Sequence, residues 1–173
     1  REVDKTDLGI KNQEEYKIEF EDNITGKEET NKVFFKDFEV LKVESIKVVG
    51  SDSIKVKFSK PVKPDENMDN QDKEPELKAD DFEINNDDIS VSKVELCNNN
   101  TEAIIKLGYT LTDGQKIKVK VKGQVGDFNG FEVAVKEENL VVKKNLAKPE
   151  VVGYKNIKKD EVTLIFNEEI KFD

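Results

Sequence analysis

Two segments of this chain repeat one strand pattern. In residues 54–62, apolar side chains alternate with lysines as far as Phe58, which is typical of a strand with one buried and one solvated face. Residues 162–170 have the same spacing, so that Phe166 corresponds to Phe58, 166 − 58 = 108 positions earlier. A recurrence at this period predicts tandem modules rather than one single domain. The other matching pairs are Ile54 with Val162, Val56 with Leu164, and Val62 with Ile170.

The segment 43–143 contains the one complete module that we expect. Turn residues such as Asn98-Asn99-Asn100 and Asp113-Gly114 separate its candidate strands, and a short helical turn is expected near residues 76–81. Seven or so short strands in about 100 residues predict an all-β fold, an immunoglobulin-like β-sandwich. The candidate strands are 43–49, 54–58, 82–84, 89–96, 103–107, 116–122 and 131–142.

The two ends of the chain match different parts of this module. Tyr16, Ile18 and Phe20 correspond to Ile117, Val119 and Val121 at an offset of 101. Short strands expected at 33–35 and 38–40 match 133–135 and 140–142 at offsets of 100 and 102. We therefore expect residues 1–42 to be closing strands of a preceding module. Residues 149–173 are expected to be opening strands of a following one, in a chain that is a segment of a longer protein.

The charge of the chain is concentrated in one place. The net charge is −9, and residues 65–88 hold 11 Asp and Glu against two lysines, so the remainder is neutral. An acidic chain without a basic stripe argues against nucleic acid and anionic membranes as partners. No stretch approaches the ~20 apolar residues that membrane insertion needs.

Several kinds of catalytic chemistry are excluded. The chain has no histidine, no phosphate-binding glycine loop and no CxxC pair. The adjacent carboxylates Asp80/Asp81 and Asp87/Asp88 would point to opposite faces of a strand, so neither pair can flank one glycosidic bond. The single cysteine, Cys97, cannot form a disulfide within the chain and is expected to be a small buried side chain. We predict no catalysis.

One acidic segment has the donor spacing of a calcium loop. With Asp65 as position 1, oxygen donors fall at positions 1, 3 and 5, a backbone carbonyl at 7 and a glutamate at 12. Ca²⁺ prefers six to eight such oxygens. Asn70 stands where these loops have glycine, and the competing interpretation is a solvated acidic loop. The predicted ligands are Asp65, Asn67, Asp69, Gln71 and Glu76, and calcium is the one candidate cofactor.

Four segments of the central module resemble a known family. They are 54–62, 79–84, 111–119 and 125–130, read as IKVKFSKPV, ADDFEI, LTDGQKIKV and VGDFNG. They resemble the bacterial Ig-like domains of S-layer proteins and surface adhesins, which are tandem SbsA-like modules. The resemblance covers the central module fully and the flanking pieces partly, and it includes no catalytic residue. It implies a secreted, spacer-like repeat at the bacterial cell surface or cell wall, whose partners are neighbouring Ig-like modules or other copies of itself.

A second hypothesis is an adhesion module that binds a cell-wall glycan, a host glycan or a host protein through loops at one end of the sandwich. Such sites usually have clustered exposed aromatic side chains. Here the Phe and Tyr residues fall mostly within the alternating strands. The sequence therefore favours the structural role.

Overall fold

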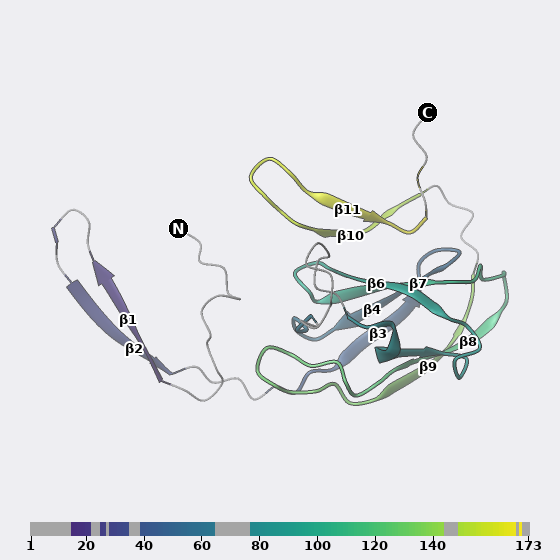
Figure 1. Ribbon diagram of the computed structural model, residues 1–173, viewed down its shortest axis with the longest axis horizontal. Helices are drawn as coiled ribbons and strands as arrows, with labels where there is room; N and C mark the ends of the chain where they lie inside the picture. The colour runs from purple at the N-terminus through teal and green to yellow at the C-terminus, as the bar shows by residue number, and fades with distance from the viewer. Residues whose placement is uncertain are drawn as a thin grey trace. The chain divides into compact units, whose positions relative to one another are not determined.

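A computed structural model describes residues 15–21, 25–26, 28–34, 39–64, 77–143, 149–168 and 170. The chain forms two units, Arg1–Glu39 and Val40–Asp173, and each is considered by itself (Figure 1). In the first unit, β1 (Glu15–Glu21) pairs antiparallel with β2 (Glu28–Phe34).

The second unit contains two larger antiparallel sheets. The four-stranded sheet has the order β3-β4-β7-β6, and the three-stranded sheet has the order β5-β8-β9. A 3-10 helix at Ala79–Asp81 leads into β5, as the expected helical turn near residues 76–81 predicts. The prediction of an all-β fold is therefore confirmed. The strands are β3 (Val43–Val48), β4 (Ser53–Phe58), β5 (Phe82–Ile84), β6 (Val91–Cys97), β7 (Glu102–Leu107), β8 (Lys116–Val121) and β9 (Lys136–Val141).

One hydrophobic core joins the two sheets. The alternating residues of β4 are buried on one side, with Phe58 only 1% exposed, and those of β8 are buried from the other side. Period-2 alternation places these side chains on a single face of each strand, so two half-apolar sheets can cover each other. The lysines between them, such as Lys57, lie on the outer face.

A further hairpin repeats the first two strands of the module. β10 (Val151–Lys155) pairs with β11 (Thr163–Phe166), and Val151 lies opposite Phe166 as Val43 lies opposite Phe58. Both hairpins have a register shift directly after that pair. The closing hydrogen bonds recur too: the Ser59 amide donates to the Lys42 carbonyl, and the Asn167 amide to the Glu150 carbonyl. The 108-residue repeat is thus present in the pairing of the backbone.

The β1–β2 hairpin has the register of β8–β9. Tyr16 lies opposite Val33, as Ile117 lies opposite Leu140. This pairing aligns Val33 with Leu140 and not with Val133, the match expected from the sequence. The two alignments differ because the connection from β1 to β2 is shorter than the connection from β8 to β9.

The last strand of the module is shorter than the predicted 131–142. β9 begins at Lys136, while the segment before it has one isolated bridge, Gly126 with Glu132. A turn is the reason: Gly130 has φ +83°, and the Asp127 amide donates to the Phe131 carbonyl. This tight local loop occupies backbone groups that would otherwise extend the ladder.

Candidate functional site

The predicted calcium ligands Asp65, Asn67, Asp69, Gln71 and Glu76 lie outside the described residues. Across the described ranges, no group of three or more Cys, Asp or Glu side chains is placed to hold a metal ion. The adjacent acids Asp80/Asp81 lie in the 3-10 helix and Asp87/Asp88 in the turn after β5, so neither pair is on a strand as expected. Asp81 is buried, and its carboxylate accepts a hydrogen bond from the Lys78 amide at 3.0 Å, which closes the 3-10 helix.

A buried ion pair holds the turn before β9. Lys60 Nζ lies 2.8 Å from Asp127 Oδ2, and the two side chains are 14% and 2% exposed. Asp127 Oδ1 accepts hydrogen bonds from the amides of Asn129 and Phe131, each at 2.9 Å. Lys60 Nζ also lies 5.2 Å from the centre of the Phe131 ring, at cation–π distance. The Gly126–Gly130 segment is therefore a turn that an ion pair and two backbone-to-carboxylate hydrogen bonds hold in place.

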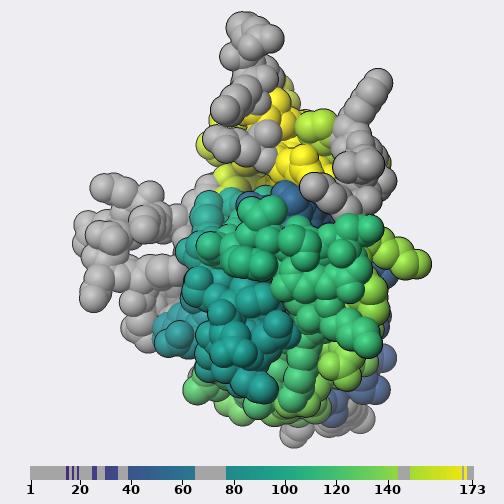
Figure 2. Space-filling model, turned by 90° about the vertical axis from the view of Figure 1, so that its right-hand side faces the viewer, coloured from purple at the N-terminus to yellow at the C-terminus, as the bar shows by residue number. Residues whose placement is uncertain are grey.

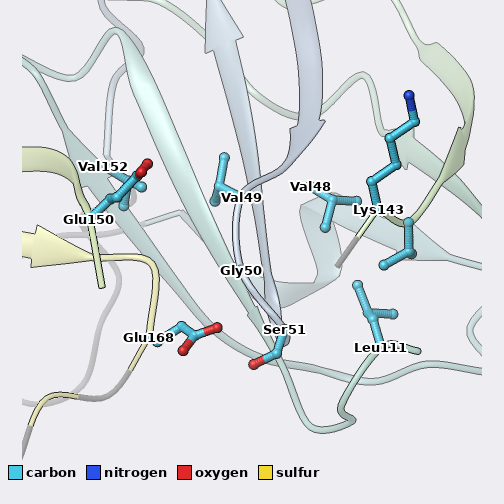
Figure 3. Close-up of a pocket in the computed structure, with 10 residues that line it drawn as sticks. Val48, Val49, Gly50, Ser51, Leu111, Lys143, Glu150, Val152 and Glu168 are labelled. Atoms are coloured by element: carbon cyan, nitrogen blue, oxygen red, sulfur yellow. The ribbon is translucent and has the colours of Figure 1, made fainter. Parts of the chain in front are cut away.

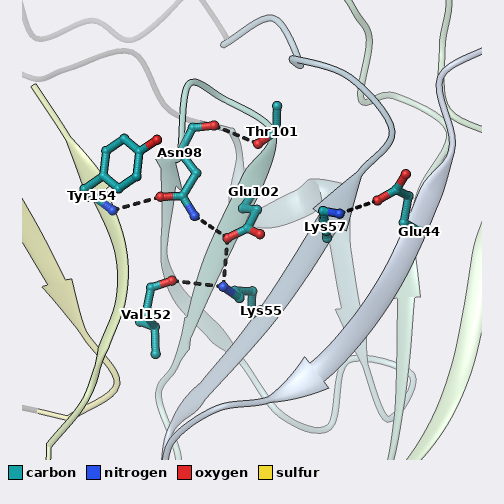
Figure 4. Close-up of polar contacts among 8 residues, drawn as sticks. All are labelled: Glu44, Lys55, Lys57, Asn98, Thr101, Glu102, Val152 and Tyr154. Carbon is teal, nitrogen blue, oxygen red and sulfur yellow. Dashed lines mark hydrogen bonds and ion pairs between the residues drawn. The ribbon is translucent and has the colours of Figure 1, made fainter. Parts of the chain in front are cut away.

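The contacts that bear most on function lie where the β10–β11 hairpin meets the four-stranded sheet. At one edge, Asn98 and Tyr154 form a reciprocal pair (Figure 4). The Asn98 amide donates to the Tyr154 carbonyl at 2.9 Å, and the Tyr154 amide donates to Asn98 Oδ1 at 3.1 Å. Asn98 has φ +53° in the β6–β7 turn, a conformation that Asn tolerates well. One asparagine therefore shapes a turn and holds the hairpin.

A charged pair supports this edge from β4 and β7. Lys55 Nζ lies 2.8 Å from Glu102 Oε2 and donates to the Val152 carbonyl at 3.0 Å (Figure 4). Asn98 Nδ2 donates to the same Glu102 oxygen at 2.5 Å. The Lys55 and Glu102 side chains are 24% and 12% exposed, so solvent screens them less than an ordinary surface pair. Lys55 thereby binds the backbone of β10, and Glu102 holds Lys55 and Asn98 in place.

An apolar patch lies beneath the hairpin. Cys97 and Ile104, on the outer face of the sheet, pack with Ile165 of β11, and Val152 adjoins them. Gly153 permits this approach, because a Cβ there would lie 2.6 Å from Cys97 Sγ. In Figure 2, the yellow hairpin lies directly against the blue and teal strands of the module. The part of the outer face around Cys97 and Ile104 is therefore covered rather than solvated.

The other end of the hairpin is anchored at the β3–β4 turn. Ser53 Oγ donates to the Asn167 carbonyl at 3.1 Å, and Lys106 Nζ donates to Ser53 Oγ at 2.6 Å. Asn167 Oδ1 in turn accepts a hydrogen bond from the Glu150 amide at 2.8 Å. A Cβ at Gly50 would overlap the Asn167 carbonyl, so only glycine fits this contact without a shift.

A cavity of about 210 Å³ marks the seam between the module and the hairpin (Figure 3). Its charged side chains are Lys143, Glu150 and Glu168, and the first two are exposed. Aliphatic residues of the module, including Leu111, line the rest. A mixed, solvent-facing lining of this kind belongs to a junction between two parts and has none of the convergent buried polar groups of a ligand site.

Burial and neighbouring charges shift the pKa values of two side chains at the junction, Cys97 and Glu95. Burial raises the pKa of the Cys97 thiol to about 11, and the Glu102 carboxylate adds to the increase. Burial also acts to raise the pKa of Glu95, but Lys93 and Lys155 outweigh it and hold the pKa below its usual value. Lys155 comes from β10 and lies 3.6 Å from Glu95, so this ion pair also crosses the junction. The thiol is therefore an inert packing group at neutral pH.

Sequence reasoning did not identify the junction residues. Lys55 and Glu102 have the positions of a solvated strand face, and the Asn98–Asn100 run is fully explained as a turn. One signal was present: Ala103, Ile104 and Ile105 form a continuous apolar run that interrupts the alternation. Such a run is typical of a strand that is buried on both faces.

Comparisons with known proteins agree with this architecture. No protein-family model matches the chain, and a comparison with curated proteins finds no match. Among solved structures, the chain resembles surface layer protein SbsC, domains 1–6, with a TM-score of 0.52 and 24% identity over 66% of this chain and 15% of that one. It also resembles the N-terminal part of the bacterial S-layer protein SbsC, with a TM-score of 0.51 and 24% identity over 65% of this chain and 26% of that one. The chain thus spans a minor part of these proteins, and the likeness shows a shared fold.

Proposed function

We propose that this chain is a non-catalytic structural repeat of a bacterial cell-surface protein of the S-layer or adhesin type. The strand order supports it. With the strands of the module lettered A to G from β3 to β9, the sheets β3-β4-β7-β6 and β5-β8-β9 become ABED and CFG. This is the arrangement of a constant-type immunoglobulin domain. We therefore assign residues 43–143 as an Ig-like β-sandwich.

The observation that carries the proposal is the repetition of β3–β4 by β10–β11. The strand pairing, the register shift and the closing hydrogen bonds all recur 108 residues later. Tandem copies of one module produce this pattern. We take residues 1–42 as closing strands of a preceding module and 149–173 as opening strands of a following one.

The docked hairpin gives the repeat a mechanical role. Residues of β4, β6 and β7 hold the first strands of the next module by backbone hydrogen bonds, ion pairs and an apolar patch. A junction fixed in this way sets the direction of each module relative to the one before it. An array of such modules extends as a spacer of defined geometry, whereas flexible linkers would let the modules reorient.

The likeness to SbsC supports a location at the bacterial cell surface. Across the described residues, no helix has the length and the apolar character to cross a membrane. Antibodies against the purified chain should label intact cells of the bacterium that makes it. Labelling that needs permeabilised cells would contradict the proposed location.

The adhesion hypothesis predicts a binding surface, and the exposed aromatics bear on it. In the second unit, Tyr109 and Phe128 are 49% and 43% exposed, on the loops that follow β7 and β8; Phe34 of the first unit is 55% exposed, on a strand. Successive loops of antiparallel strands lie at opposite ends, so the two rings do not make one platform. We expect no saturable binding of the chain to cell-wall glycans or host matrix proteins. Binding that is lost in Phe128→Ala or Tyr109→Ala would favour adhesion instead.

The calcium loop at residues 65–76 is a separate proposal that rests on the sequence alone. A ligand that binds the folded state only must raise the melting temperature as its concentration increases. We expect a higher melting temperature in millimolar calcium than in chelator, and Asp65→Asn together with Glu76→Gln should remove the difference. Identical melting curves of the unmodified chain in the two buffers would contradict the proposal.

A further inference from the structure

The β10–β11 hairpin and the β3–β4 hairpin have the same internal structure. Every strand pair of β10–β11 recurs in β3–β4 at an offset of 108 residues, as does the register shift after the first pair. A side chain after the second strand also closes each hairpin. The Lys42 amide donates to Ser59 Oγ at 3.0 Å, and the Glu150 amide donates to Asn167 Oδ1 at 2.8 Å. The two hairpins can therefore be compared position by position.

The face of β10–β11 that docks on the sheet has three residues suited to this contact. Val152 and Ile165 are apolar and pack with Cys97 and Ile104 of the four-stranded sheet. Gly153 lies between them and has no side chain to separate the hairpin from the Cys97 thiol. The hairpin thus offers an apolar pair and a close backbone approach on one face.

The counterparts of these three residues in β3–β4 are Glu44, Ser45 and Lys57. Glu44 Oε2 lies 2.7 Å from Lys57 Nζ, in an ion pair whose side chains are 44% and 50% exposed (Figure 4). The apolar pair of one hairpin is thus a solvated ion pair in the other, and the glycine is a serine. Because the strand pairing and the closing hydrogen bonds are shared, these differences concern docking and not the formation of the hairpin.

All three differences oppose docking. A Cβ at position 153 would lie 2.6 Å from Cys97 Sγ and 3.0 Å from Cys97 Cβ, so a serine there needs a shift of the hairpin. A glutamate and a lysine buried against an apolar patch would lose the hydration of both charges. Lys55 of the sheet lies close by, but its Nζ is already paired with Glu102 at 2.8 Å. It therefore cannot neutralise a new glutamate without leaving its own partner.

We propose that the patch at Cys97 and Ile104 is selective for the kind of hairpin that opens the next module. It binds a hairpin with apolar residues at positions 152 and 165 and glycine at 153, and it does not bind one with Glu, Ser and Lys at these positions. Specificity of this kind combines a favourable contact with a steric clash and buried charges against the alternative. Three residues of the opening hairpin thus determine whether a junction is fixed or free. This goes beyond the spacer function, which does not say what decides between the two.

An exchange of residues in the full chain tests the proposal. Val152→Glu together with Ile165→Lys gives β10–β11 the charged pair of β3–β4, and the two new side chains can pair with each other, so the hairpin itself should form. We expect iodoacetamide to label the Cys97 thiol at least about tenfold faster than in the unmodified chain, because two apolar side chains no longer cover it. Slow hydrogen exchange of the β8 amides shows in the same sample that the module stays folded.

Val151→Glu together with Leu164→Lys is the matched control. It adds the same charges to the same two strands, at side chains that are 52% and 47% exposed, and should leave the labelling of Cys97 unchanged. Equal acceleration in this control would contradict selectivity, because any charge on the hairpin would then release it.

Gly153→Ser tests the steric clash separately and should also accelerate the labelling. Unchanged labelling in both Gly153→Ser and the Val152→Glu, Ile165→Lys variant would overturn the proposal and leave the repeat and the spacer function intact. Labelling of the unmodified chain at the rate of a free thiol would show that the hairpin is not docked. That result would overturn the selectivity together with the fixed junction.

Discussion

At the scale of single residues, equivalent positions of the repeat contribute differently to the free energy of unfolding. Phe58 and Phe166 share the same register, but Phe58 is buried in the core and Phe166 is only partly buried. Burial rather than position in the repeat sets the cost of truncation, because a buried ring leaves a cavity when it is removed.

Phe58→Ala should therefore lower the free energy of unfolding by about 3–5 kcal/mol, as measured in urea. Phe166→Ala is the matched control and should cost less than about half as much, because part of its ring remains in water. Similar losses in both variants would show that the β11 face is covered in the isolated chain.

The Lys60–Asp127 pair is the buried ion pair with the largest expected contribution. Asp127→Asn leaves a largely buried lysine without its countercharge, and it should lower the free energy of unfolding by roughly 3 kcal/mol. Glu44→Gln removes the partner of Lys57 in an exposed pair, with side chains 44% and 50% exposed, and should cost much less than Asp127→Asn because solvent screens this pair. Equal effects in thermal or urea unfolding would show that the turn at Asp127 is solvated.

At the scale of elements, the docking of β10–β11 depends on close backbone approach. Gly50→Ala would place a Cβ against the Asn167 carbonyl, so we expect this end of the hairpin to lift from the sheet. Overpacking of about 1–3 kcal/mol corresponds to labelling of the Cys97 thiol at least about fivefold faster than in the unmodified chain. Gly123→Ala is the control, because a Cβ there meets its nearest atom at 3.5 Å, an ordinary contact. Unchanged labelling in Gly50→Ala would mean that the hairpin is not anchored at Asn167.

At the scale of elements, the sequence predicts the positions of most strands but not how the strands are arranged. The bounds of β3, β4, β5, β7 and β8 agree with the predicted strands to within one residue, because alternation and turn residues are local properties. The order of the strands and the docked hairpin depend on contacts between distant segments. Lys55 and Asn98 have ordinary local roles, as a strand lysine and a turn residue, and only the fold brings them to β10.

At the scale of the whole molecule, the described parts of the chain have two kinds of apolar surface. One core is closed between the sheets of the module, and a smaller patch at Cys97, Ile104 and Ile165 closes the junction with the next hairpin. The other kind is exposed, and it includes Val151, Val162 and Leu164 of the β10–β11 hairpin. The core stabilises the sandwich of two sheets, and the patch fixes the β10–β11 hairpin on the four-stranded sheet.

The β10–β11 hairpin is docked on the outer face of the four-stranded sheet as a fixed junction. Amide hydrogen exchange measured by NMR tests it most directly, because the reciprocal amides of Asn98 and Tyr154 are bonded only while the hairpin is docked. We predict that both amides exchange at least about a hundredfold more slowly than an unstructured peptide under native conditions. Exchange of the Tyr154 amide at the rate of an unstructured peptide, while the amides of β4 and β7 remain protected, would contradict the account.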